Sequence, residues 1–290
     1  MKMHRAFFMY KFHGLIFYIN NNLTYKLNMM NKTINRDHQS TNKVFDNRSL
    51  QTDYSTLVPI LRDGLRVLDV GCGTGAISNG IAKLVGPRGC VIGIDNTEKF
   101  ITSGQESYKE TPNLELVHSD LFNYSNEAHF DLIVSARTLQ WLSHPKEALI
   151  KMKSLLNPGG QISILDYNHE KLEWSPLPPE RMQLFYQAFL KWRADAGMNN
   201  QIADDLADYF IEAGFHSIEV FNADEIYKKE DHNFLERIGI WSKVANLKQI
   251  VEEGYITEDL RLKAIREYDE WIKTDAEQMI MKLKEVRGRV

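Results

Sequence analysis

The sequence has few cysteines, no long apolar run and little net charge, and each absence removes a class of protein. Its two cysteines, Cys72 and Cys90, are too few for a disulfide framework or for a zinc site built from cysteine alone. No run of about 18 apolar residues is present, so we expect no membrane insertion. A net charge of −4 gives no basic footprint for nucleic acid, which is not an expected partner. The low cysteine content favours a cytoplasmic location.

Residues 1–43 differ in composition from the rest of the chain. They hold a single acidic residue, Asp37, and no proline, but half of the ten methionines. A signal peptide needs an uninterrupted apolar stretch and a small-residue cleavage site, and neither follows the basic residues Lys2 and Arg5. We therefore expect a disordered N-terminal extension over 1–43 and one folded domain over 44–290.

From residue 44 onward, short apolar segments alternate with amphipathic ones. The apolar segments are bounded by glycine, proline or polar turn residues, which is typical of buried strands. The expected strands are 66–70, 90–94, 114–118, 130–135 and 161–166. Strands that alternate with helices predict a parallel sheet covered on both faces, and such a sheet binds its ligand beyond the carboxyl ends of the strands.

The residues at these carboxyl ends indicate a ligand that contains a nucleoside. Gly71, Gly73 and Gly75 lead from the first strand into a helix, so the backbone there can lie close to a ligand. The second strand ends in Asp95, whose carboxylate can accept hydrogen bonds from a ribose, and Asp120 follows the third strand. The glycine spacing is also typical of dinucleotide-binding enzymes, so an NAD(P)-dependent oxidoreductase is an alternative.

Five segments together resemble the motifs of class I S-adenosylmethionine-dependent methyltransferases. Residues 67–75 (VLDVGCGTG) resemble the first motif, and Asp69 stands where most dinucleotide-binding dehydrogenases have an apolar residue. IGID ending at Asp95, HSDL ending at Leu121, FDLIVS from Phe130 and LLNPGG from Leu155 are similar to the later motifs. The resemblance covers about residues 44–170 and points to the small-molecule subgroup that includes menaquinone and ubiquinone biosynthesis enzymes.

The resemblance implies a fold, a cofactor and a set of binding residues. The fold is a doubly wound, Rossmann-like α/β domain with a seven-stranded, mostly parallel sheet, an antiparallel final strand and a helical insertion. The cofactor is S-adenosyl-L-methionine. The residues implied as its contacts are Asp69, Gly71, Gly73, Gly75, Asp95, Asn96, Asp120, Leu121, Ser135, Ala136 and Arg48.

The implied contacts divide by the part of the cofactor that they meet. Asp95 would hold the ribose diol and Asp120 the adenine amino group, whereas the glycines would pack against the methionine part. Asn96 and Leu121 would line the adenine, and the backbone of residues 135–136 would lie near the methionine amine. Arg48 is either a partner of the cofactor carboxylate or a solvated helix charge.

Residues beyond 170 are expected to form the side of the molecule that binds the methyl acceptor. Aromatic and aliphatic residues at helical spacing predict helical elaborations over about 171–214 and 230–276. A sixth strand is expected at 215–221 and a last strand from about 278 to 286. In the resembled family the last strand runs antiparallel beside the sixth.

The expected reaction is direct in-line displacement of the methyl group onto a small-molecule acceptor, without a metal ion, because the sulfonium already activates that group. Trp141 would face the sulfonium or the acceptor. Tyr167 and His169 follow the fifth strand as candidate catalytic residues, the histidine as a base near neutral pH. Arg137 would orient an anionic acceptor or form a surface ion pair. A non-catalytic protein that binds S-adenosylmethionine is a second alternative.

Overall fold

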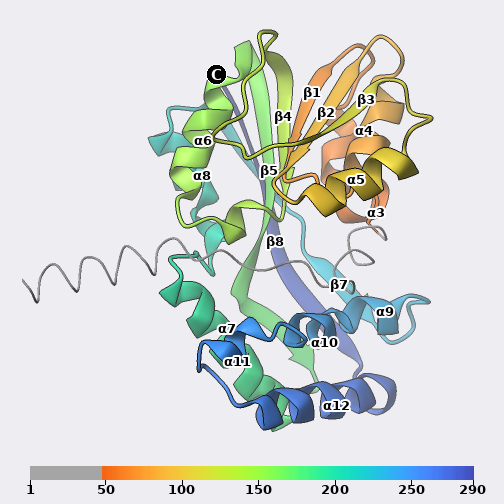
Figure 1. The fold of residues 1–290 in the computed structure, drawn as a ribbon, viewed down its shortest axis with the longest axis vertical. Helices are drawn as coiled ribbons and strands as arrows, with labels where there is room; N and C mark the ends of the chain where they lie inside the picture. The colour runs from red at the N-terminus through yellow and green to blue at the C-terminus, as the bar shows by residue number, and fades with distance from the viewer. Residues whose placement is uncertain (1–47) are drawn as a thin grey trace, which may run out of the picture.

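A computed structural model describes residues 48–290, so the predicted extension over 1–43 lies outside the described residues. One mixed sheet runs through the molecule in the order β3-β2-β1-β4-β5-β8-β6, with β7 paired to β8 (Figure 1). The strands are β1 (Arg66–Val70), β2 (Cys90–Asp95), β3 (Leu114–His118), β4 (Phe130–Ala136), β5 (Leu156–Ser175), β6 (His216–Asn222), β7 (Glu225–Lys228) and β8 (Gln278–Arg289).

The predicted doubly wound fold is confirmed, with one correction to the number of strands. Strands β1 to β5 pair in parallel, and β8 lies antiparallel between β5 and β6. The prediction of seven strands is wrong because β7, only four residues long, adds an eighth beside β8.

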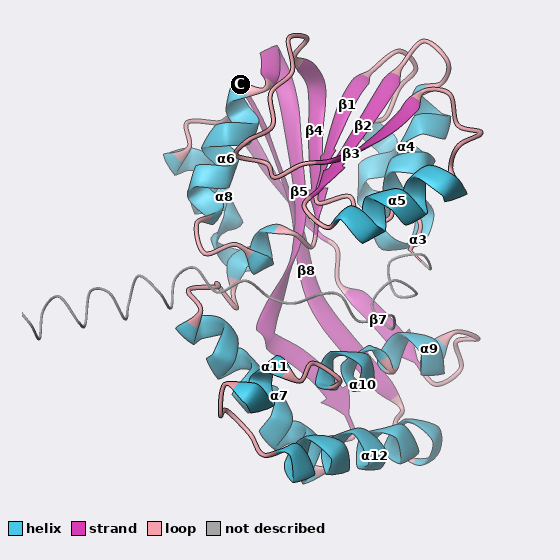
Figure 2. Cartoon of the chain, viewed as in Figure 1, coloured by secondary structure: helices cyan, strands magenta, loops and turns pink. Residues whose placement is uncertain are grey.

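Helices cover both faces of the sheet and also form a separate group at one end (Figure 2). The helices of the sheet region are α3 (Leu50–Asp53), α4 (Ala76–Val85), α5 (Glu98–Ser107), α6 (Pro145–Ser154) and α8 (Ile202–Glu212), with short 3-10 turns at Ser55–Ile60 and Leu139–Trp141. The group at the carboxyl end of β1 and β4, which we call the cap, consists of α7 (Glu180–Asp195), α9 (Phe234–Ile238), α10 (Ile240–Ala245), α11 (Gln249–Glu252) and α12 (Glu258–Thr274).

The alternation of side chains along the strands produces two hydrophobic cores. Val67 of β1 packs with α3 and α4 on one face of the sheet, whereas Leu68 and Val70 pack with α6 and α8 on the other. Helix α8 therefore covers the sheet through Leu206 and Phe210, although it falls within the segment 171–214 that was expected on the substrate side.

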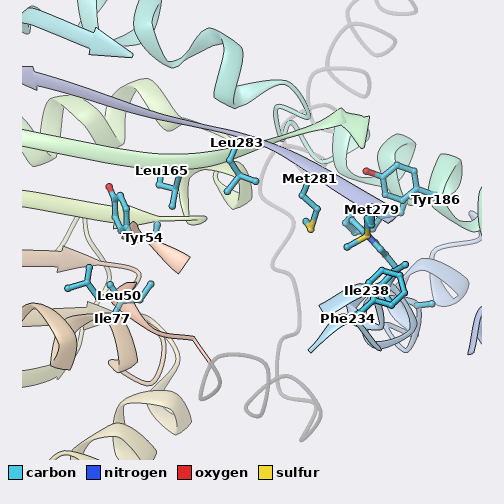
Figure 3. Close-up of a cluster of buried hydrophobic side chains, with 14 of the residues drawn as sticks. Leu50, Tyr54, Ile77, Leu165, Tyr186, Phe234, Ile238, Met279, Met281 and Leu283 are labelled. Atoms are coloured by element: carbon cyan, nitrogen blue, oxygen red, sulfur yellow. The ribbon is translucent and has the colours of Figure 1, made fainter. Parts of the chain in front are cut away.

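Two long strands carry the first of these cores from the sheet into the cap. Strand β5 continues to Ser175, well beyond the predicted end at 166, and pairs with β8 along most of its length. Buried side chains follow this ribbon, so that Leu283 lies near the sheet, Met281 in between, and Met279 near the cap residue Ile238 (Figure 3). The predicted helical insertion over 230–276 is the part of the cap that this ribbon supports.

Candidate functional site

The glycine-rich loop after β1 is held tightly against the end of β2. The backbone N–H groups of Gly71 and Cys72 both donate to the carbonyl oxygen of Ile94, at 2.8 and 3.0 Å. Gly71 has a φ of +73°, and a Cβ at that position would collide with the side chain of Thr138. Only glycine fits this turn without strain, which leaves the loop backbone open to a ligand.

Asp95 links the glycine loop to the start of α5. One carboxylate oxygen accepts a hydrogen bond from the backbone N–H of Gly73 at 3.0 Å, and the other accepts one from Thr97 at 2.9 Å. The side chain is nearly buried. Because each carboxylate oxygen can accept more than one hydrogen bond, these contacts orient the group and leave acceptor capacity for a diol.

Asp69 lies beneath the same loop and is fully enclosed. Its carboxylate accepts a hydrogen bond of 2.6 Å from Ser78 Oγ of α4. The net pKa of Asp69 is raised to about 6: burial is the largest cause, the Ser78 hydrogen bond opposes it, and the nearby charge of Asp95 adds to it. Asp69 thus fastens α4 to β1 at the wall of the site.

A small cavity brings together several of the predicted cofactor residues. It is lined by Arg48, Asp69, Gly71, Cys72, Gly73, Ala76, Ile77 and Ala136. The cavity combines bare loop backbone, an arginine and a neighbouring carboxylate, Asp95. These are the groups that the methionine and ribose parts of S-adenosylmethionine require, so the residues present fit this cofactor.

The remaining cofactor candidates lie at the ends of β2, β3 and β4. Asn96 and Asp120 are exposed, and Asp120 accepts a hydrogen bond from the backbone N–H of Phe122 at 2.8 Å. Leu121 is buried. The hydroxyl of Ser135 donates to the carbonyl oxygen of Val70 at 2.8 Å, so this side chain links β4 to β1. The contact predicted for Ser135 with the methionine amine uses the backbone and not this hydroxyl.

A second cavity lies between the carboxyl ends of the strands and the cap. Its lining residues come from α3 and the residue Arg48 before it, from β5, β7 and β8, and from α9 and α10 of the cap. They are Arg48, Asp53, Tyr167, Glu225, Tyr227, Glu236, Arg237, Ile240, Lys243 and Met281. Arg48 lines both cavities, so its side chain borders each of them. We call the second one the acceptor cavity.

Arg137 is buried beside the acceptor cavity, which excludes the surface ion pair considered from the sequence. Its Nε donates to Tyr167 Oη at 2.6 Å, and its guanidinium forms an ion pair with Glu225 of β7. Burial lowers the pKa of Arg137, but Tyr167 and Glu225 oppose this effect and the net pKa lies well above the usual value. Glu225 was not predicted from the sequence, because a four-residue strand gives no distinctive pattern.

His169 lies inside an aromatic cluster instead of in a loop. Its ring centroid is 5.4 Å from that of Tyr167 and 6.1 Å from that of Trp241, and its Nε2 forms a hydrogen bond with Gln140 Oε1. Burial, helped by the charge of Arg193, holds the pKa of His169 well below 6.5. The imidazole is therefore neutral at physiological pH, and a role as base would use Nδ1.

Trp141 is half-buried where the turn after β4 meets α7. The guanidinium carbon of Arg193 lies 4.6 Å from the centroid of its ring. This cation covers one ring face, and the contact of Trp141 with the sulfonium or the acceptor stays a prediction.

Among residues 48–290 no group of three or more histidine, cysteine, aspartate or glutamate side chains could hold a metal ion. Within the same range, none of the helices is long and apolar enough to cross a membrane.

The fold and the two adjoining cavities define a Rossmann-like enzyme that binds a nucleoside cofactor at its glycine loop. A family model described as "Methyltransferase domain" matches residues 61–239, so the chain belongs to the methyltransferase-domain family. It is an enzyme that transfers a methyl group from S-adenosylmethionine to a small-molecule acceptor, which confirms the predicted class and removes the oxidoreductase alternative.

Curated relatives agree with this assignment, and a solved structure agrees with the fold. The chain is 29% identical over 175 residues to demethylmenaquinone methyltransferase of Staphylococcus aureus strain JH9, covering 55% of this chain and 71% of that protein. The enzyme of the same name from Staphylococcus carnosus is 27% identical over the same length. In fold, the chain is similar to the YcgJ protein of Bacillus subtilis, with a TM-score of 0.52 at 14% identity, covering 82% of this chain and 97% of that one.

Proposed function

We propose that the chain methylates a small ring compound of the quinol type, bound in the acceptor cavity. Two kinds of observation support this substrate class. Tyr167 and Tyr227 give the cavity aromatic walls, and charged side chains surround them. The curated relatives at 27–29% identity carry the name demethylmenaquinone methyltransferase. We also propose a reducing compartment such as the cytoplasm, because Cys72 and Cys90 are both free thiols.

The observation that carries the proposal is the position of Arg48 in the lining of both cavities. In-line displacement requires the methyl donor and the nucleophile to approach within about 3–3.5 Å without intervening water. The shared lining residue supports an arrangement of this kind, because it places the two cavities next to the same side chain. The bound cofactor supplies a methyl group that is already activated by its sulfonium.

The residues of this chain then have three tasks. The glycine loop and Asp95 hold the cofactor, Arg48 lies between the two cavities, and the cap closes the acceptor cavity against water. The ion pair of 2.7 Å between Arg237 of α9 and Asp53 of α3 joins the cap to the sheet region. Tyr167, which lines the acceptor cavity, is the candidate for holding a proton of the acceptor. His169 is the candidate base; it is not among the lining residues and lies behind Tyr167, with the two ring centroids 5.4 Å apart.

The test is methyl transfer by the full chain with S-adenosylmethionine that carries a labelled methyl group. The panel contains a reduced naphthoquinone, a primary amine and a carboxylic acid, and binding of S-adenosylmethionine and of NAD is measured in parallel. We expect label in the reduced naphthoquinone and saturable binding of S-adenosylmethionine but not of NAD. Label only in the amine or the acid would overturn the substrate class. Cofactor binding without transfer to any small molecule would favour the non-catalytic alternative.

A further inference from the structure

Four polar side chains form one hydrogen-bonded network along the wall of the acceptor cavity. Tyr227 Oη donates to Glu225 Oε2 at 2.8 Å, the other carboxylate oxygen of Glu225 pairs with the Arg137 guanidinium, and Arg137 Nε donates to Tyr167 Oη. The side chains of Arg137 and Glu225 are only 2% and 13% exposed. Burying an ion pair this deeply is costly, so a gain in stability is a weak explanation for the network.

The backbone of Arg137 shows that the position of its side chain is tightly constrained. Its φ of +58° lies in the left-handed region, which is unfavourable for a residue with a long side chain. The backbone N–H donates to the carbonyl oxygen of Leu165 at 2.7 Å and holds this turn in place. Such strained conformations persist where the surroundings enforce them, and they cluster at functional sites.

The network leaves the hydroxyl hydrogen of Tyr167 available. Its oxygen accepts from Arg137, and no acceptor for its own hydrogen is found in the part of the chain that the structure describes. Burial raises the pKa of Tyr167 to about 12, although Arg137 opposes the shift. The hydroxyl therefore keeps its proton at physiological pH and acts as a hydrogen-bond donor at the cavity wall.

The charges around the cavity favour a negatively charged partner for this donor. Its lining residues include three cations (Arg48, Arg237 and Lys243) and three carboxylates (Asp53, Glu225 and Glu236). Arg137, paired to Glu225, adds a fourth cation. The excess of one positive charge adds to that of the cofactor sulfonium, so an acceptor that binds as an anion is stabilised by both.

We propose that Arg137 and Glu225 are positioning residues that hold the Tyr167 hydroxyl as a hydrogen-bond donor to an anionic oxygen of the methyl acceptor. This inference rests on the proposed function and deepens it: the site selects acceptors with an ionised ring hydroxyl over neutral rings of the same size. The Arg137–Glu225 pair fixes the direction of the donor, and the Tyr167 hydroxyl makes the contact.

The experiment uses two coloured probes of nearly equal shape, 4-nitrophenolate and its neutral methyl ether, 4-nitroanisole. Both are titrated into the full chain loaded with S-adenosylhomocysteine, at a pH at which the phenol is ionised. Because a hydrogen bond to a charged group is the stronger kind, wild-type protein should bind the phenolate roughly tenfold to hundredfold more tightly than the ether. Tyr167→Phe and Arg137→Met should abolish this preference, and Arg137→Lys should retain part of it.

A matched control separates this role from general packing. Tyr209→Phe removes a tyrosine hydroxyl on α8 whose one hydrogen-bond partner within residues 48–290 is Asn199, and it should leave the preference between the probes unchanged. If Arg137→Met does not fold, the nearly isosteric Tyr167→Phe still decides, since a thermal melt and the affinity for S-adenosylmethionine report whether that variant is intact.

Three results would overturn the inference: equal wild-type affinity for the two probes, no saturable binding of the phenolate, or a preference that survives in Tyr167→Phe. These outcomes can be distinguished from a failure of the proposed function. That proposal fails if the wild-type chain transfers no labelled methyl group to a small molecule, whatever the probes show.

Discussion

Replacing Asp95 by alanine tests both the architecture of the cofactor site and its chemistry. The substitution removes the acceptor of two backbone hydrogen bonds, from Gly73 and Thr97. Hydrogen bonds to a charged group are worth about 1.5–3 kcal/mol each, and water can replace part of this at the cavity rim. We therefore expect a loss of roughly 2–5 kcal/mol in the free energy of unfolding, or about 5–15 °C in Tm.

The same substitution should weaken binding of S-adenosylmethionine at least about tenfold, because the ribose diol loses a charged acceptor. Calorimetric titration measures the affinity and a thermal scan measures the stability. Asp120→Ala is the matched control for stability alone, since its exposed carboxylate accepts one backbone hydrogen bond, from Phe122, and its loss should cost less than about 1 kcal/mol. It is no control for affinity, because Asp120 is itself a predicted contact of the adenine. An Asp95→Ala protein with unchanged Tm and unchanged affinity would refute the role given to this carboxylate.

Three further predictions follow from buried charged or titratable groups. The pKa of Asp69 is about 6 in the folded state against an ordinary 3.8 for an aspartate, so the folded state binds this proton more tightly and the free energy of unfolding should fall as pH rises from about 4 to 6. Asp69→Asn should reduce that slope in denaturation curves, and an unaltered slope would count against this role of Asp69. His169→Ala should lower kcat roughly 10²–10⁴-fold with unchanged cofactor affinity. The wild-type rate should not fall as the pH is lowered through 6.5, because the pKa of His169 is already well below that value. A variant with unimpaired kcat would mean that catalysis depends on alignment of the two substrates alone. Arg237→Ala should lower the free energy of unfolding by roughly 1–3 kcal/mol in urea denaturation, since it leaves buried Asp53 without its ion-pair partner. Arg88→Ala, which removes an exposed ion pair, should lower it by almost nothing. Equal effects of the two substitutions would contradict the structure.

The parts of the fold that sequence could predict are those encoded by local pattern. Strands β1 to β4 and the glycine loop were located to within about a residue, because apolar segments and glycine punctuation depend only on neighbouring residues. Strand β7 was missed, and β5 was predicted too short, since their extent depends on pairing with β8 more than a hundred residues away from β5 in the chain. Pairing of this kind leaves little trace in a single sequence.

The cofactor side of the site was predictable for the same reason, and the acceptor side was only partly so. Arg137 follows the end of β4 and Tyr167 follows the end that the sequence predicts for β5, but Glu225 lies 88 positions from its partner Arg137 and shows no motif. His169, like Tyr167, lies within β5 and past that predicted end. Its neutral state was not foreseen, because that state is set by aromatic side chains that the cap brings to it.

The most direct test of the central claim is a crystal structure of the full chain with S-adenosylhomocysteine and a reduced naphthoquinone. We expect the ring of the naphthoquinone in the acceptor cavity, between Tyr167 and Tyr227, with its nucleophilic atom in line with the cofactor sulfur and with Arg48 beside this line. The gap between the sulfur and the nucleophilic atom should leave room for one methyl group, so that with S-adenosylmethionine the methyl carbon would lie about 3–3.5 Å from the nucleophile. A ring bound elsewhere, or a cofactor bound away from the glycine loop, would contradict it.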